Sequence, residues 1–314
     1  PFLFNNMEDA VDRILQAKDE GEKVLIFGDR DVDGITSTAV LYDYLTSIGV
    51  DVTYRLPSGT DPYGLNKDAV DSFEKNFGSL VITVDCGISN MEEIAYASSK
   101  GMDVIVLDHH TPPEVLPSPA IIINPKCADS GYPFKDISGC AVVYKVVTAL
   151  RFAHTELYKN EISLLTAKIN ADKTSATVEV LKLQNLVEKA RFSQSIASGT
   201  SIMETKLVDF LRGQQIFVWD EKTTSAILSQ IFTNGAEFNC MDLRPQAAKI
   251  SPAFATLSLE QLKAKSRLAK YNPSFDSEIM GFYNVFVTFM NAQIARQFPH
   301  NAEANERDLQ LVAL

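Results

Sequence analysis

Short apolar runs alternate with helix-like segments through the first part of the chain. The runs that have the length and composition of buried strands are residues 24–27, 80–84 and 104–107. Between them, residues 35–48 and 91–100 carry apolar side chains at helical spacing. Strands that are joined through helices need crossover connections. The pattern therefore predicts an α/β fold, in which a mostly parallel sheet has helices on both faces.

Acidic or imidazole side chains follow each of these runs. Because ligands bind at the carboxyl ends of the strands in parallel sheets, we expect these side chains to meet at one edge of the sheet. They are Asp29, Asp31 and Asp33 after the first run, Asp85 after the second, and Asp108, His109 and His110 after the third.

A mixture of carboxylates and imidazoles indicates a site for divalent metal. Neighbouring carboxylates repel one another unless a cation or proton lies among them. The ligand set suits manganese, magnesium or iron, and zinc stays open. Two ions ~3.5–4 Å apart would support phosphoryl hydrolysis. Taken alone, residues 29–33 could instead be an Asp-rich turn that is exposed to solvent and binds no metal.

Composition bounds the class of protein. With 314 residues and 46% hydrophobic residues, the chain is long enough for two globular domains, and no apolar run has the length of a membrane span. Four cysteines without a C-x-x-C pair fit a reducing cytoplasm. The net charge of −11 argues against a broad basic surface for duplex DNA. Because the chain begins at Pro1 without a signal-type segment, we expect an excised or processed piece.

Three motifs resemble a known family in order and spacing. Residues 28–37 (GDRDVDGITS), 84–89 (VDCGIS) and 108–110 (DHH) are similar to the motifs of DHH-family phosphoesterases. Within that family they resemble most the RecJ-type, single-stranded-DNA-specific 5′-to-3′ exonucleases of DNA repair and recombination. The resemblance spans residues 1 to about 150 and resumes in the last few residues. It implies a metal-dependent hydrolase that acts on phosphodiester bonds of single-stranded DNA.

The resemblance also implies roles for the clustered residues. It implies Mn²⁺ as the cofactor, with Mg²⁺ as the alternative. Asp85 would bridge two ions, and Asp29 would orient a ligand. Asp108 would hold an imidazole in the right tautomer, with a structural strand-end aspartate as the alternative reading. The implied metal ligands are Asp31, Asp33, Asp85, His109 and His110, and His110 could instead contact the scissile phosphate.

The chain departs from the family after residue 150. We expect residues 1–150 to form the DHH core, 151–305 an inserted α+β domain, and 306–314 a return into the core. In the family, the segment that would begin at residues 308–314 ends in an aspartate, and this aspartate completes the metal site. Since that aspartate would lie past Leu314, we expect this piece to be impaired.

The inserted domain resembles the ribonuclease-H-like fold of proofreading exonucleases. We expect a hairpin (163–169 and 177–183), then helix 206–211, strand 215–219, helix 222–232, strand 238–243, and helices 258–270 and 278–298. The first strand carries no carboxylate at 164–168, so this domain is predicted to be non-catalytic. We expect Asp220, Glu221 and Asp242 to be surface or capping residues.

Other functions stay open at this point. One alternative is a non-catalytic scaffold or interaction protein that keeps the DHH fold. Another is a DHH phosphodiesterase that acts on short oligonucleotides, cyclic dinucleotides or polyphosphate. The expected partners are single-stranded DNA and a replication or repair protein that contacts the inserted domain, and no membrane.

Overall fold

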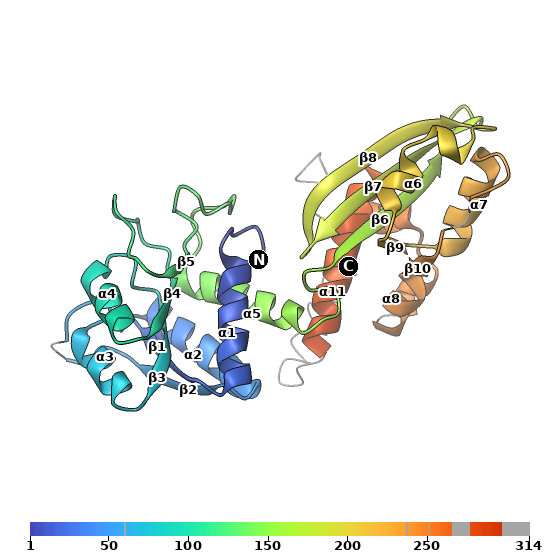
Figure 1. Cartoon of the computed structure of the whole chain (residues 1–314). Coiled ribbons are helices and arrows are strands. Elements are labelled where there is room, and N and C mark those ends of the chain that lie inside the picture. The colour runs from blue at the N-terminus through green and yellow to red at the C-terminus, as the bar shows by residue number, and fades with distance from the viewer. Residues whose placement is uncertain (60, 237, 251, 266–276, 297–314) are drawn as a thin grey trace. The chain divides into compact units, whose positions relative to one another are not determined.

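The computed structural model divides the chain into two compact units, Pro1–Ala153 and His154–Leu314 (Figure 1). It describes residues 1–59, 61–236, 238–250, 252–265 and 277–296. The predicted return of residues 306–314 into the first unit lies outside the described residues.

Within the described residues, no helix is both long and apolar enough to cross a membrane.

The first unit is built on a five-stranded sheet with the order β2-β1-β3-β4-β5. Every neighbouring pair is parallel, as the alternation of strands and helices predicted. The strands are β1 (Lys23–Gly28), β2 (Asp51–Arg55), β3 (Gly78–Val84), β4 (Asp103–Leu107) and β5 (Ile121–Ile123). Because all five run the same way, the residues that follow β1, β3 and β4 lie at one edge of the sheet.

Helices cover both faces of this sheet, which confirms the predicted α/β class (Figure 1). The helices α3 and α4 contact one another and cover one face, while α5 contacts both α1 and α2 and the three cover the other. The five helices are α1 (Met7–Glu20), α2 (Val32–Ser47), α3 (Lys67–Glu74), α4 (Met91–Ser99) and α5 (Gly139–Ala153).

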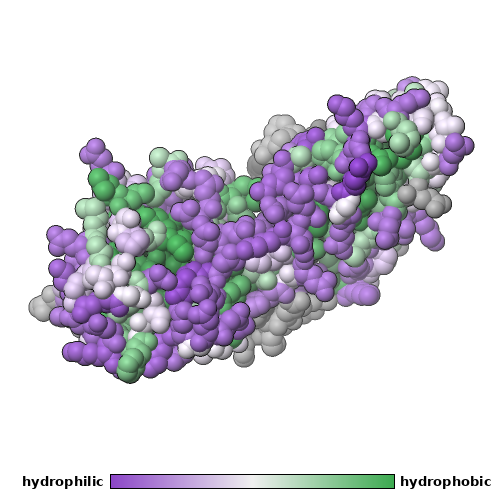
Figure 2. All heavy atoms as spheres, in the orientation of Figure 1, coloured by the Kyte–Doolittle hydropathy of each residue, from purple (hydrophilic) through white to green (hydrophobic). Residues whose placement is uncertain are grey.

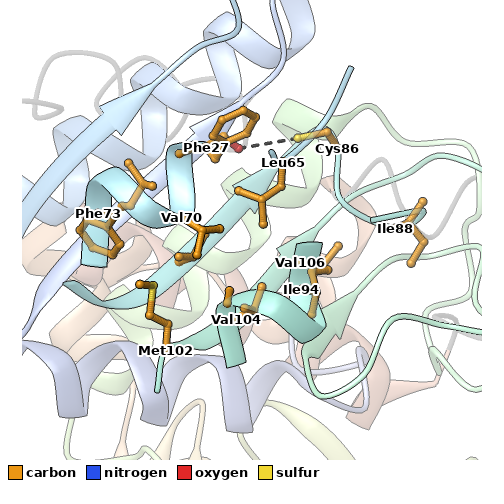
Figure 3. Packing of buried hydrophobic residues seen from close by; sticks show 14 of the residues in the cluster. Phe27, Leu65, Val70, Phe73, Cys86, Ile88, Ile94, Met102, Val104 and Val106 are labelled. Atoms are coloured by element: carbon orange, nitrogen blue, oxygen red, sulfur yellow. Dashed lines mark hydrogen bonds between the residues drawn. The ribbon is translucent and has the colours of Figure 1, made fainter. Parts of the chain in front are cut away.

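The core beneath α3 and α4 follows from the alternation of side chains along the strands. Figure 3 shows Phe73 of α3 and Ile94 of α4 in the same apolar cluster as Val106 of β4. Phe27 is fully buried, and its carbonyl oxygen accepts a weak hydrogen bond from the Cys86 thiol at 3.7 Å. Burying an apolar side chain of this size contributes about 1.5–3 kcal/mol. This packing fixes the strand ends that carry the acidic residues.

The second unit contains a mixed sheet with the order β10-β9-β6-β7-β8. The strands β6, β7 and β8 are antiparallel neighbours, whereas β9 is parallel to β6 and β10 is parallel to β9. The strands are β6 (Glu161–Ile169), β7 (Ser175–Gln184), β8 (Val187–Ala197), β9 (Gln215–Val218) and β10 (Cys240–Asp242). The predicted hairpin is therefore present, and both predicted later strands join it.

Within the described residues, the helices of the second unit follow the predicted order with three additions, η1, α8 and η2. The helices are η1 (Ile202–Glu204), α6 (Leu207–Leu211), α7 (Glu221–Ile231), α8 (Arg244–Ile250), η2 (Pro252–Ala255), α9 (Leu259–Lys265) and α11 (Glu278–Arg296). The strand β8 and the helix α8 were not predicted. In β8 the polar side chains are mostly exposed, so the strand lacks the apolar alternation on which such a prediction depends. The rest of the helices predicted over 258–270 and 278–298 lies outside the described residues.

Hydrophilic side chains cover most of the face of each unit that Figure 2 shows. Apolar side chains are also visible on the first unit in this view. Val115 is among the exposed apolar residues of this unit.

Ile82→Ala is expected to lower the free energy of unfolding of the first unit by about 2–5 kcal/mol, because Ile82 is fully buried in the central strand β3. Val115→Ala is the matched control, since Val115 is exposed. Urea unfolding followed by hydrogen exchange in peptides of the first unit measures both changes. Equal effects of the two substitutions would contradict the described core.

Candidate metal centre

The acidic turn between β1 and α2 is held by its own backbone. Asp31 is the N-cap of α2, and one of its carboxylate oxygens accepts a hydrogen bond from the Gly34 amide at 2.9 Å. This cap starts the helix at Val32, three residues before the predicted start at residue 35. Asp29 is 7% exposed and accepts a hydrogen bond from the Arg30 amide at 2.7 Å. The turn therefore presents Asp29 and Asp31 together at the carboxyl end of β1.

Asp33 connects the first turn of α2 to the beginning of α5. Its two carboxylate oxygens accept hydrogen bonds from the Gly139 amide at 2.7 Å and from the Cys140 amide at 2.8 Å. Negative charge is favourable at this end of a helix. Because each carboxylate oxygen has a second lone pair, these bonds leave acceptor capacity for a cation.

Asp85 is the most buried carboxylate of the predicted metal ligands, with 1% of its surface exposed. It follows β3 with a left-handed φ of 58°, and its amide donates to the Leu107 carbonyl at 2.8 Å. Its Oδ1 atom is buried and accepts no hydrogen bond within the described residues, although His109 Nε2 lies 3.1 Å away. Burial, followed by the charges of Asp33 and Asp31, raises the pKa of Asp85 to about 7.

Asp108 is fully buried and orients the imidazole of His110. Its Oδ1 atom accepts hydrogen bonds from the amides of His109 and His110 and lies 2.7 Å from His110 Nδ1. Its Oδ2 atom accepts a hydrogen bond from the Ile88 amide at 3.0 Å. Since a carboxylate can only accept, His110 Nδ1 carries the proton and Nε2 keeps its lone pair for a ligand.

The seven side chains predicted from the sequence meet at one edge of the sheet. Two groups of possible metal-ligating atoms lie there, each with its atoms within 4.8 Å of one another, and Asp85 belongs to both. The groups are Asp29, Asp31 and Asp85, and Asp85, His109 and His110. Asp33 lies next to the second group, with its Oδ2 atom 3.6 Å from His109 Nε2. Asp108 belongs to neither group.

These residues fit divalent cations by their chemistry. The donors are carboxylate oxygens and imidazole nitrogens, the ligands that Mn²⁺ and Mg²⁺ accept. A buried carboxylate oxygen without a hydrogen-bond donor, beside like charges, is stable as an anion only when a cation neutralises it. The raised pKa of Asp85 describes the protein without that cation.

Two neighbours of the site, Tyr63 and Arg30, were not identified as functional from the sequence. The Tyr63 hydroxyl lies 3.4 Å from the Asp85 carbonyl oxygen and 3.5 Å from His110 Nδ1. Burial, then the charge of Asp108, raises the pKa of Tyr63. Arg30 donates to the carbonyls of Gly59 and Asp61 and so holds the loop that carries Tyr63. The segment Tyr63-Gly64-Leu65, which also resembles the family, was the available signal for Tyr63.

The described part of the second unit contains no comparable group of three metal-ligating side chains. Asp220 caps α7 by accepting a hydrogen bond from the Thr223 amide at 3.0 Å, and Asp242 accepts one from the Arg244 amide at 3.1 Å. Both contacts are the capping roles expected from the sequence.

Comparison with known proteins finds relatives for about half of the chain. Residues 23–170 match the family described as DHH family, N-terminal domain. The single-stranded-DNA-specific exonuclease RecJ of Bacillus subtilis is 40% identical over 151 residues, and RecJ of Escherichia coli is 38% identical over 149 residues. A crystal structure of exonuclease RecJ bound to manganese is 30% identical, with a TM-score of 0.44.

The matches cover only part of each protein. They include 48% of this chain and 19% of the Bacillus subtilis relative, and 47% of this chain and 26% of the Escherichia coli relative. The match to the manganese-bound structure covers 47% of this chain and 38% of that chain.

Gly139→Ala is expected to weaken Mn²⁺ binding at least about tenfold, because a Cβ atom at Gly139 would come within 2.3 Å of Asp85 Oδ1. Cys140→Ala is the matched control, since it keeps the amide that donates to Asp33 and adds no atom. Isothermal titration calorimetry with MnCl₂ measures both variants. Unchanged affinity in Gly139→Ala would contradict the close approach of α5 to Asp85.

Without metal, the free energy of unfolding is expected to fall as the pH rises from about 4 to about 7. The pKa of Asp85 is about 7 in the folded chain and 3.8 for the ordinary carboxyl, so between these values the folded chain binds the extra proton. That stabilisation is present at low pH and lost as the pH rises through the folded value. Asp85→Asn should flatten this part of the profile, and urea unfolding in EDTA at about pH 5 and pH 8 measures the difference.

Proposed function

We propose that this chain, whose first unit is a domain of the DHH family, hydrolyses phosphodiester bonds with divalent metal ions. The observation that carries the proposal is the place of Asp85 in both groups of possible ligands. A buried carboxylate shared by two sets of ligands is the arrangement that holds two cations close together. Mn²⁺ is the proposed ion, and Mg²⁺ the alternative, because both accept carboxylates and imidazoles.

The proposed ligands divide between the two groups. Asp29 and Asp31 would hold one ion with Asp85, whereas His109 and His110 would hold the other, with Asp33 beside His109. The family resemblance implied a ligand set without Asp29, and this assignment adds it. Asp33 also accepts hydrogen bonds from the amides at the beginning of α5. Bound cations would supply positive charge that neutralises the phosphodiester and its transition state.

Asp108 and Tyr63 lie beside the proposed metal ligands and help to position them. Asp108 fixes the ring of His110 through Nδ1, which directs Nε2 to the site. The Tyr63 hydroxyl stands beside the same ring and the backbone of Asp85. Its raised pKa keeps it protonated at neutral pH, so Tyr63 can donate a hydrogen bond to a phosphate oxygen.

Single-stranded DNA is the proposed substrate, cleaved from the 5′ end. The relatives that match the first unit are single-stranded-DNA-specific exonucleases. The net charge of −11 is consistent with a site that holds DNA locally through metal, not through a broad basic surface.

The four cysteines are free, which fits the proposed reducing cytoplasm. The second unit is proposed to contact a replication or repair protein.

Asp85→Asn is expected to lower the Mn²⁺-dependent release of nucleotides from 5′-labelled single-stranded DNA by about 100-fold or more, because the shared ligand loses its charge. Asp43→Asn is the matched control, since Asp43 is an exposed carboxylate of the helix α2. Mn²⁺ binding by calorimetry is the second readout on both variants. If the reading frame continues past Leu314, the longer product is assayed in parallel.

The substrate class is tested in the same assay. Duplex DNA, a dinucleotide, a cyclic dinucleotide and polyphosphate replace the single strand in separate reactions. Faster hydrolysis of any of these would reassign the substrate while keeping the metal centre. A chain that binds no Mn²⁺, or activity that is indifferent to Asp85→Asn, would leave the non-catalytic scaffold as the function.

A further inference from the structure

The loops that border the metal centre contain a single basic residue. These loops follow β1, β3 and β4 and comprise residues 29–31, 85–90 and 108–120. Arg30 is the one lysine or arginine in their sequences, whereas each loop carries at least one carboxylate. Because opposite charges attract, a cation in such acidic surroundings is expected to pair with one of these carboxylates.

Arg30 pairs with no carboxylate of the described residues. Its side chain is exposed, and its guanidinium donates hydrogen bonds to the carbonyl oxygens of Gly59 at 3.3 Å and of Asp61 at 2.9 Å. A carbonyl group has no net charge, so these bonds leave the positive charge of Arg30 without a counterion. A guanidinium also has more N–H donors than two carbonyls use. Arg30 can therefore bind an anion without giving up either bond.

The side chain of Arg30 connects two segments that border the metal centre. Its backbone lies between Asp29 and Asp31, which belong to one group of possible metal ligands. Its guanidinium contacts Asp61, two residues before Tyr63, whose hydroxyl is 3.4 Å from the Asp85 carbonyl oxygen. The charge of Arg30 is therefore placed at the border of the metal centre, beside the ligands and not among them.

A nucleic acid strand brings more than one negative charge to this border. Bound cations would neutralise the scissile phosphate, but the next phosphate along the strand has the same charge. Among the residues of the three loops, only Arg30 can supply a positive charge to that second phosphate. Guanidinium groups form short, charge-assisted hydrogen bonds with phosphate oxygens. A compound with one phosphodiester group would not use this contact.

We propose that Arg30 binds the substrate phosphate that lies next to the scissile one. This inference rests on the proposed function, because it takes a phosphodiester strand as the ligand of the metal centre. Arg30 then favours strands with several phosphates over compounds that have a single phosphodiester group.

The affinity of the full chain for short single strands is measured by fluorescence anisotropy, with the label at the 3′ end and with Ca²⁺ in place of Mn²⁺ to slow hydrolysis. Arg30→Ala should weaken binding about tenfold, because one charge-assisted contact is lost. It should also lower the slope of log affinity against log salt concentration by about 0.7. Lys23→Ala is the matched control, since Lys23 is an exposed cation at the opposite end of β1, and it should bind as the parent chain does.

The phosphate that Arg30 contacts is located by removing phosphate charges one at a time. A neutral methylphosphonate replaces each linkage near the 5′ end in turn, and a further strand lacks the 5′-phosphate. Next to the scissile position, loss of one charge should weaken binding to the parent chain about tenfold and leave binding to Arg30→Ala unchanged. Arg30→Lys keeps the charge and should retain part of this dependence. If Arg30 only held the loop, the lysine and alanine variants would weaken every strand equally.

The proposal is overturned if the parent chain binds no strand, if Arg30→Ala binds as tightly as the parent chain, or if neither neighbouring phosphate depends on Arg30. Hydrolysis is read separately, through the Mn²⁺-dependent release of nucleotides and Asp85→Asn. Dependence on Arg30 without hydrolysis would contradict only the proposed function, and hydrolysis without that dependence would contradict only the role of Arg30.

Discussion

Electrostatic repulsion at the edge of the parallel sheet is the constraint on which the first unit depends. Five carboxylates follow three strands, and four of them accept hydrogen bonds from backbone amides. Asp29 accepts one from Arg30, and Asp31 accepts one from Gly34. Asp33 accepts two from α5, and Asp108 accepts three. Amide donors favour the charged form of a carboxyl group. Asp85 Oδ1 has no donor within the described residues, so the unmet charge is concentrated on one residue.

This distribution links distant parts of the chain. Asp33 and Gly139 are 106 positions apart, yet the hydrogen bond between them fixes where α5 begins. The same glycine packs against the Asp85 side chain, which leaves no space for a methyl group. The geometry around Asp85 therefore depends on the packing of α5 as much as on β3. A site formed in this way is rigid because helices on one face and strands in the middle share its residues.

The sequence was sufficient for the strands of the first sheet and for the convergence of their acidic ends. Buried parallel strands are nearly continuous apolar runs, and their carboxyl ends must share an edge. It was not sufficient for contacts between distant segments, such as the amides of Gly139 and Cys140 on Asp33. The strand β8 was missed because an edge strand with exposed polar side chains has no apolar period. The pairing of Asp220 with Arg244 likewise depends on tertiary placement, which spacing does not encode.

The backbone conformation and the buried charge of Asp85 both cost the fold free energy. A left-handed φ of 58° costs a residue with a side chain about 1–2 kcal/mol, and glycine avoids that cost. Replacement by glycine would also remove a buried charge. The fold alone therefore does not require a carboxylate at position 85, because an uncharged residue would avoid the cost of the buried charge.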